Sequence, residues 1–231
     1  MTLEELSDLP ESDFIWLPQP ESKYTFFHPT LKHGIPIAKE RKKLGKDWVN
    51  VHLELNSQRF HMPTIKQFID FLKLLRSGEV CDLVGQRLSI DEITDIYGKI
   101  TKRRTPIEDI WLDARFYTVN YRAKRLIIDE EHRGKAQIDL RHLTHLRFIS
   151  PLESWALGKC IKKESCYIDL LNSKNPHGLP TVKNESDQFR LWPPKKEHTA
   201  VFRAGEEVGL YCSYPFYQIT DTYTYITRKK N

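Results

Sequence analysis

Residues 60–78 read FHMPTIKQFIDFLKLLRSG, and this stretch decides how the chain folds. Pro63 fixes the backbone of a turn, and Thr64 with a glutamine three residues later forms a capping box, the signature of a helix start. Apolar residues then recur at helical spacing and form a wide face that is expected to be buried. Gly78 suits the left-handed position that follows a helix. The sequence therefore predicts a helix over residues 64–76 with one side packed in a core.

Two more helices flank this one along the chain. Over residues 46–58 an apolar face at helical spacing includes His52, which we expect to be packed there rather than to bind a ligand. Ser89 and Glu92 form a second capping box, which predicts a helix over 90–100. Helices followed by many short strands indicate an α+β fold. We expect strands at 111–121, 125–129, 140–148, 165–171, 189–192, 200–204, 208–212 and 222–227.

One domain with an N-terminal arm accounts for the length of 231 residues. Residues 1–35 are rich in proline and aromatic residues and predict an irregular arm, packed on a domain formed by residues 36–231. The chain has no run of roughly 18 apolar residues, so we expect no membrane span. Its acidic start lacks a hydrophobic segment, so we expect no conventional signal peptide. Both the cytoplasm and a virion surface stay open as locations.

The net charge of +5 is mild, and the basic clusters at 102–104, 122–125 and 228–230 lie near acidic residues. Basic clusters can contact phosphate groups, but no recognition helix or RNP-like motif accompanies them, so we do not expect nucleic acid as a partner. Cys160 and Cys166 have the wrong spacing for a zinc site. Buried thiols and a disulfide between these two cysteines both stay open, and no metal or other cofactor is expected.

The C-terminal residues 211–227 read YCSYPFYQITDTYTYIT and include five tyrosines. Tyrosine offers a large, rigid contact at low entropic cost, and serine and threonine offer adaptable hydrogen bonds, as in binding surfaces. The alternation within 222–227 is typical of a half-buried strand, in which Tyr223 and Tyr225 face a sheet or a core. The part before it predicts a solvent-facing surface for a ligand, made of Tyr211, Ser213, Tyr214, Phe216, Tyr217 and Ile219, with Asp221 at its margin.

The order of a helix, the segment HMPTIKQF (61–68), a second helix and a later set of strands resembles the C-type lectin fold in its formylglycine-generating-enzyme-like form. In that family an RLPT-x-x-E(W/F) motif opens the second helix, so the resemblance implies that Phe68 takes the aromatic core position. It also implies two main helices that brace a twisted, mostly antiparallel sheet. The motifs of formylglycine catalysis and of calcium-dependent sugar binding do not occur, so neither activity is expected.

The C-terminal region, at about 200–227, looks like the variable region of proteins diversified by a retroelement, particularly archaeal and viral ones. Mutagenesis of the adenines in AAY codons can produce a limited set of amino acids. Within residues 211–227, only Gln218 lies outside this set. Family members often end in a Gly-Val-Arg-like strand, whereas this chain has Tyr225-Ile226-Thr227-Arg228. The resemblance implies a variable protein, not an enzyme, that recognises a receptor or another cell-surface ligand.

An alternative function of another class stays open from the residues themselves. Asp109, Asp113 and Asp129 lie on or beside expected strands, where a metal-dependent nuclease holds its carboxylates. The basic clusters would then contact nucleic acid in a viral or archaeal protein. His142 and His145 offer two imidazoles, but no third metal ligand accompanies them.

Overall fold

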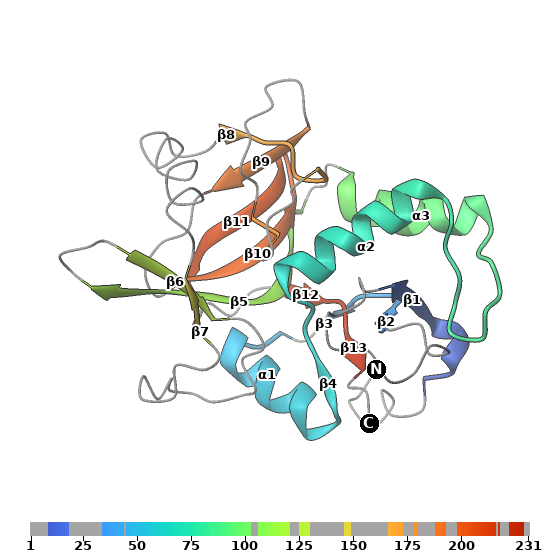
Figure 1. Cartoon of the computed structure of the whole chain (residues 1–231), viewed down its shortest axis with the longest axis horizontal. Helices are drawn as coiled ribbons and strands as arrows, with labels where there is room; N and C mark the ends of the chain where they lie inside the picture. Colours follow the sequence, from blue (N-terminus) through green and yellow to red (C-terminus); the bar gives the residue numbers. More distant parts are fainter. Residues whose placement is uncertain are drawn as a thin grey trace, which may run out of the picture.

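The computed structural model describes residues 9–18, 34–43, 45–102, 106–120, 125–129, 146–148, 166–172, 178–179, 188–192, 198–215, 217 and 222–228. These residues form two β-sheets and three α-helices, an α+β fold (Figure 1). None of the described helices is long and apolar enough to cross a membrane.

The three helices begin and end close to where the sequence predicts them: α1 (Trp48–Ser57), α2 (Ile65–Ser77) and α3 (Ile90–Thr101). The capping box of α2 is complete, because Thr64 Oγ1 accepts from the backbone of Gln67 while the Gln67 side chain accepts from the backbone of Thr64. The Ser89 side chain also caps α3. Its predicted capping box is wrong in one half, since the Glu92 carboxylate accepts from Lys39 Nζ at 2.8 Å instead.

The smaller sheet joins the two ends of the described chain. Its order is β1 (Phe14–Pro18), β2 (Gly34–Ala38), β13 (Thr227–Arg228) and β4 (Phe60–His61), with antiparallel neighbours throughout. A 3-10 helix, η2 (Glu11–Asp13), leads into β1. The prediction of an irregular arm is therefore wrong for Phe14–Pro18, whose apolar side chains alternate with the pleat and are mostly buried.

The larger sheet is mixed. Its order is β3 (Lys42–Lys43), β12 (Thr222–Thr224), β5 (Glu108–Asn120), β10 (His198–Ala204), β11 (Val208–Pro215), β9 (Phe189–Trp192) and β8 (Cys166–Tyr167). Strands β6 (Arg125–Asp129) and β7 (Leu146–Phe148) branch from β5. The strands expected at 111–121 and 125–129 pair as β5 and β6, and those expected at 200–204 and 208–212 pair as β10 and β11. The pairs β12–β5 and β11–β9 are parallel.

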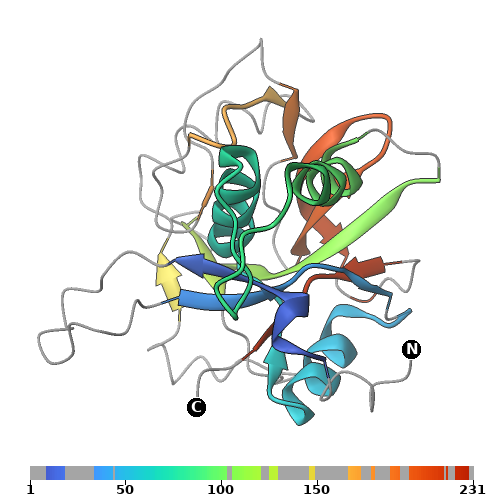
Figure 2. The same ribbon diagram turned by 90° about the vertical axis from the view of Figure 1, so that its right-hand side faces the viewer.

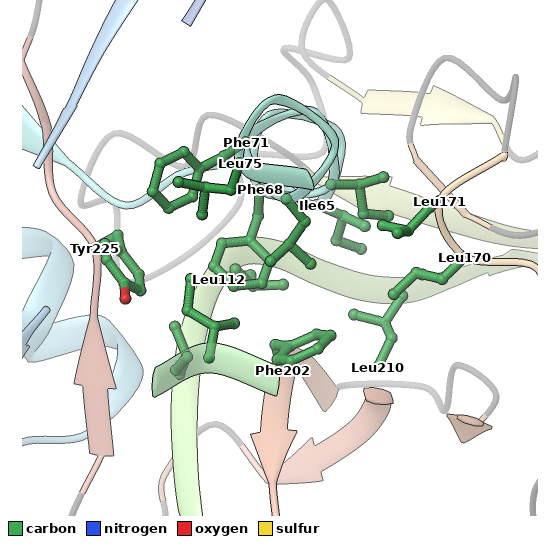
Figure 3. Close-up of a cluster of buried hydrophobic side chains, with 14 of the residues drawn as sticks. Ile65, Phe68, Phe71, Leu75, Leu112, Leu170, Leu171, Phe202, Leu210 and Tyr225 are labelled. Atoms are coloured by element: carbon green, nitrogen blue, oxygen red, sulfur yellow. The ribbon is translucent and has the colours of Figure 1, made fainter. Parts of the chain in front are cut away.

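Helices cover β5 from both sides, which divides the interior into two cores. Figures 1 and 2 show α2 and α3 on one side of β5 and α1 on the other. In the first core the apolar face of α2 packs on the sheet, and Figure 3 shows Phe68 pointing toward Leu112 and Phe202. The second core gathers around Trp48 and Trp111. Neighbouring side chains of β5 thus lie in different cores, because successive side chains of a strand point to opposite faces of the sheet.

The chain crosses between the two sheets, and between the two cores, at Tyr225 and Ile226. Tyr225 packs on Phe68 and Phe71 in the first core, with ring centroids 6.0 and 5.4 Å away (Figure 3). Ile226 belongs to the second core. The prediction of one strand over 222–227 is therefore wrong: β12 and β13 are separate strands in different sheets. Burial of Tyr225 in a core is confirmed.

Several predictions concern residues outside the described ranges. These are the residues Cys160, His142 and His145, and most residues of the three basic clusters. A disulfide between Cys160 and Cys166 therefore stays a prediction. Of the cysteines whose side chains are described, Cys81 is an exposed free thiol and Cys212 a buried one.

Gly178 provides a test of how the described segment 178–179 packs on the start of α2. Its φ is +75°, and a Cβ placed on it would lie 2.8 Å from the backbone N and Cα of Lys66. Because both the backbone conformation and the space exclude a side chain, Gly178→Ala should lower the free energy of unfolding by about 2 kcal/mol or more. Urea denaturation followed by circular dichroism measures this loss.

Gly85→Ala is the matched control. Gly85 also has a positive φ, +85°, but no atom of the described residues lies within 4 Å of its added Cβ. This substitution should cost only about 1 kcal/mol, the strain of the backbone alone. Equal losses in the two variants would show that the close contact between Gly178 and α2 does not contribute to stability.

Candidate functional site

Five side chains from four neighbouring strands form a continuous cluster on the larger sheet. We call Tyr167, Arg190, Trp192, Tyr211 and Arg203 the aromatic–arginine ladder. They come from β8, β9, β9, β11 and β10, in that order. They lie on the face opposite to α2, since Leu191, Leu210 and Phe202, their neighbours in the chain, belong to the core under α2.

The register of the strands brings the ladder together. Arg203 lies opposite Asp109 on one side and Gly209 on the other, Gly209 lies beside Arg190, and Arg190 lies opposite Tyr167. The next row along the strands contains Trp111, Val201, Tyr211 and Trp192. Directly paired residues share a face and stand about 5 Å apart, so a charged row and an aromatic row run side by side.

Tyr211 is held between two flat side chains. Its ring stacks on that of Trp192, with centroids 3.4 Å apart and planes 15° from parallel. The guanidinium carbon of Arg203 lies 4.1 Å from the centre of the Tyr211 ring. Tyr211 is nevertheless half-buried rather than buried, so one of its edges faces solvent while its orientation is fixed.

Arg203 is itself fixed by a two-point ion pair. Its Nε and Nη2 donate to the two oxygens of Asp109 at 2.6 and 2.8 Å. Burial lowers the pKa of Arg203, but the hydrogen bonds and charge of Asp109 outweigh this and raise it. Arg203 is therefore a permanent cation in a planar, bidentate geometry, which is the strongest form of such a pair.

The other end of the ladder is more open. The guanidinium carbon of Arg190 lies 4.6 Å from the centre of the Tyr167 ring and 5.9 Å from that of Trp192. Arg190 Nη1 also forms an ion pair with Glu207, in the turn between β10 and β11. Tyr167 is among the exposed large side chains. The ladder thus runs from a closed end at Asp109 to an open end at Tyr167.

A β-bulge corrects the sequence prediction for Tyr214. Val201 pairs with Tyr211, and Thr199 pairs with Tyr214. Between these two pairs, one residue of β10 faces two residues of β11. This extra residue reverses the alternation, so that Tyr211 and Tyr214 face the same side although three positions separate them. Tyr214 was predicted to face solvent, but it is only 6% exposed and packs edge-on against Trp111 at 5.1 Å.

The other residues of the predicted surface differ in how exposed they are and in whether the structure describes them. Ser213 is half-buried on β11, and Tyr217 is 72% exposed beyond its end. Phe216, Ile219 and Asp221 lie outside the described residues. Four members of the ladder were not predicted from the sequence: Tyr167, and with it Arg190, Trp192 and Arg203. For the last three, alternation with core residues in FRLW (189–192) and VFRA (201–204) was the available signal.

The two described carboxylates of the alternative nuclease hypothesis, those of Asp109 and Asp113, each lie against another side chain. Asp109 pairs with Arg203, and buried Asp113 lies 3.3 Å from Nε2 of His52 on α1. The side chain of Asp129 is outside the described part. Among the described side chains, no group of three His, Cys, Asp or Glu is arranged to hold a metal ion. His52 is packed in the interior, as predicted.

Comparisons with protein-family models, with curated proteins and with solved structures found no match for this chain. The C-type-lectin-like fold and the relation to retroelement-diversified proteins therefore stay predictions.

Two tyrosines of the predicted surface should now behave differently when replaced by serine. Tyr214→Ser removes a ring from the second core, so the free energy of unfolding should fall by about 3 kcal/mol or more. Tyr217→Ser removes an exposed ring and should change it by no more than about 0.5 kcal/mol. Urea denaturation of both variants checks this, and a small loss for Tyr214→Ser would mean that its ring is not a core residue.

The pKa of Tyr211 gives a prediction for alkaline solution. Burial raises this pKa above its usual value of 10.0, against the opposing charge of Arg203. A raised pKa means that the folded protein keeps the phenolic proton longer than the unfolded chain does. The associated stability is present below pH 10 and is lost as pH rises through the folded-state pKa.

Tyr211→Phe should therefore make the decline of stability above pH 10 shallower, as measured by urea midpoints between pH 8 and pH 11. Tyr217→Phe controls for the loss of a hydroxyl group from an exposed ring. A decline equally steep in wild type and Tyr211→Phe would show that Tyr211 does not cause it.

Proposed function

We propose that this protein is a non-enzymatic binding protein that recognises a protein ligand, such as a cell-surface receptor, through the aromatic–arginine ladder. Ser213 on β11 and Tyr217 beyond its end are the other described residues of the predicted surface that are not buried. Recognition would use ring edges, the hydroxyl of Tyr211 and guanidinium donors, without covalent chemistry or a required metal.

The fixed orientation of Tyr211 between Trp192 and Arg203 is the observation that carries the proposal. Tyr, Trp and Arg are the residues that dominate binding energy at protein interfaces. A surface whose side chains are already ordered loses less conformational entropy when a partner binds. The ladder combines these residue types with that order, and it is half-buried rather than covered.

The same geometry favours a protein ligand over nucleic acid. Single-stranded nucleic acids bind by stacking bases on open aromatic faces and by contacts between cations and phosphates. Both faces of the Tyr211 ring are occupied, by Trp192 and by Arg203. The two arginines of the ladder are each paired with a carboxylate, Asp109 or Glu207. The surface therefore offers polar edges with little net charge.

The scaffold we propose is the C-type lectin-like fold, in a variable protein of the archaeal or viral retroelement-diversified type. The pairing of β13 with β2, with α1 and α2 between them in the chain, supports this fold because a lectin-like domain also folds its terminal strand back. Variation would be confined to positions that the interior tolerates. In the described part of 211–227, Tyr211, Ser213 and Tyr217 meet this condition, and buried Tyr214 and Tyr225 do not.

A pair of displayed libraries tests the proposal. One library randomises Tyr211, Ser213 and Tyr217, and the matched library randomises Cys212, Tyr214 and Tyr225, which are buried. We expect the first library to stay folded, as judged by protease resistance, and to yield binders to unrelated protein targets. The second library should lose protease resistance.

A first library that is as protease-sensitive as the second, or that folds but gives no binders, would contradict the proposal. The DNA around the gene provides a separate check on the origin of the surface. A nearby imperfect copy of codons 200–227 that differs only at adenines, beside a reverse transcriptase gene, is expected for a diversified protein.

A further inference from the structure

We infer that Arg190 is where this surface accepts a carboxylate group of its protein partner, and that Glu207 occupies this position until the partner binds. The inference rests on the proposed function, because it names the partner chemistry that the open end of the ladder recognises. It concerns one charged side chain and can be tested with a small acidic peptide in place of the partner.

The two ion pairs of the ladder differ in how tightly they are held. Asp109 is a β5 residue opposite Arg203, and its side chain is only 8% exposed. Glu207 comes from a turn, and its side chain is 41% exposed. Exposed ion pairs contribute little to stability because water solvates both partners. Glu207 can therefore leave Arg190 at a low cost, whereas Asp109 is fixed to Arg203.

Glu207 accepts from only one of the guanidinium nitrogens of Arg190. Glu207 contacts Nη1, while the buried Nε of Arg190 has no hydrogen-bond acceptor among the described residues. A guanidinium group carries its donors in a planar fork that matches the two oxygens of a carboxylate. Arg203 shows the complete version of this geometry with Asp109, on the same face of the sheet. An incoming carboxylate that bonds to two guanidinium nitrogens through both of its oxygens would improve on the single contact of Glu207.

The surroundings of Arg190 favour a side chain from a protein over a phosphate group. Arg190 lies over the Tyr167 ring and beside Trp192, which are apolar walls for the methylene groups of an acidic residue. A phosphate carries more charge and is best held by more than one cation, but the nearest arginine across the sheet, Arg203, is committed to Asp109. Gly209 separates the two arginines and adds no side chain that could block an approach.

Removal of the internal carboxylate tests the exchange. A blocked diglutamate peptide and inorganic phosphate serve as probes, and NMR of the arginine Nε–H groups in the 15N-labelled protein reports binding. We expect Glu207→Gln to bind the peptide about tenfold more tightly than wild type, because the peptide no longer competes with Glu207. Arg190→Lys in the same background should remove this gain, since lysine lacks the planar fork.

Asp95→Asn is the matched control, because it breaks another exposed ion pair, between Asp95 and Lys99 on α3. It should leave peptide binding unchanged. Glu207→Ala repeats the test without the amide group that Glu207→Gln introduces, which could itself bond to Arg190. Equal peptide affinity in wild type and both Glu207 variants would overturn the inference, and so would tighter binding of phosphate than of the peptide.

These outcomes are separate from those of the proposed function. If the displayed libraries yield binders while the Glu207 variants show no gain, the surface binds proteins but not through a carboxylate at Arg190. If the libraries fail, the proposed function falls whatever the NMR measurement gives.

Discussion

The passage of the chain between the two cores at Tyr225 and Ile226 is the constraint on which the rest of the structure depends. The hydroxyl of Thr224 donates to the backbone carbonyl of Trp111 at 3.0 Å. The hydroxyl of Thr227 donates to the backbone carbonyl of His61, also at 3.0 Å. The backbone of Ala38 donates to the carbonyl of Ile226 between them. These bonds tie β5, β4 and β2 to one short segment. Without it the smaller sheet would lose a central strand, and the two cores would lose the residues that join them.

The ladder follows from this arrangement because β5 has a core on each side. Once α2 and α3 cover one face and α1 covers part of the other, the remaining area of the second face lies over β10, β11 and β9. The bulge between β10 and β11 then turns Tyr214 inward against Trp111 and leaves Tyr211 at the border between core and solvent. Interior packing and surface recognition are thus set by the same irregularity in the sheet, and a change in the bulge would affect both.

Local signals made the helices and many of the strands predictable from the sequence. The capping residues Thr64 and Ser89 and the apolar face of α2 act within a few positions, and the structure follows them. The long-range features were not predictable in this way. A strand break at Tyr225 depends on a second sheet that the local pattern does not contain, and the orientation of Tyr214 depends on a bulge that reverses a period of two. Aromatic composition did point to Tyr211, but its partners Trp192 and Arg203 come from other strands, so strand order was needed to find the ladder.

The position of β13 has a consequence for the synthesis of the protein. Thr227 bonds to a residue 166 positions earlier in the chain, and β13 lies between β2 and β4, which are made long before it. While the ribosome still holds the later residues, β1, β2, β4 and the apolar side of α1 have no complete sheet to join. Contacts this distant in sequence form slowly, and apolar surface exposed in the meantime favours aggregation. The smaller sheet can therefore form only after residues 222–228 have left the ribosome, and a shortened product without them lacks the strand between β2 and β4.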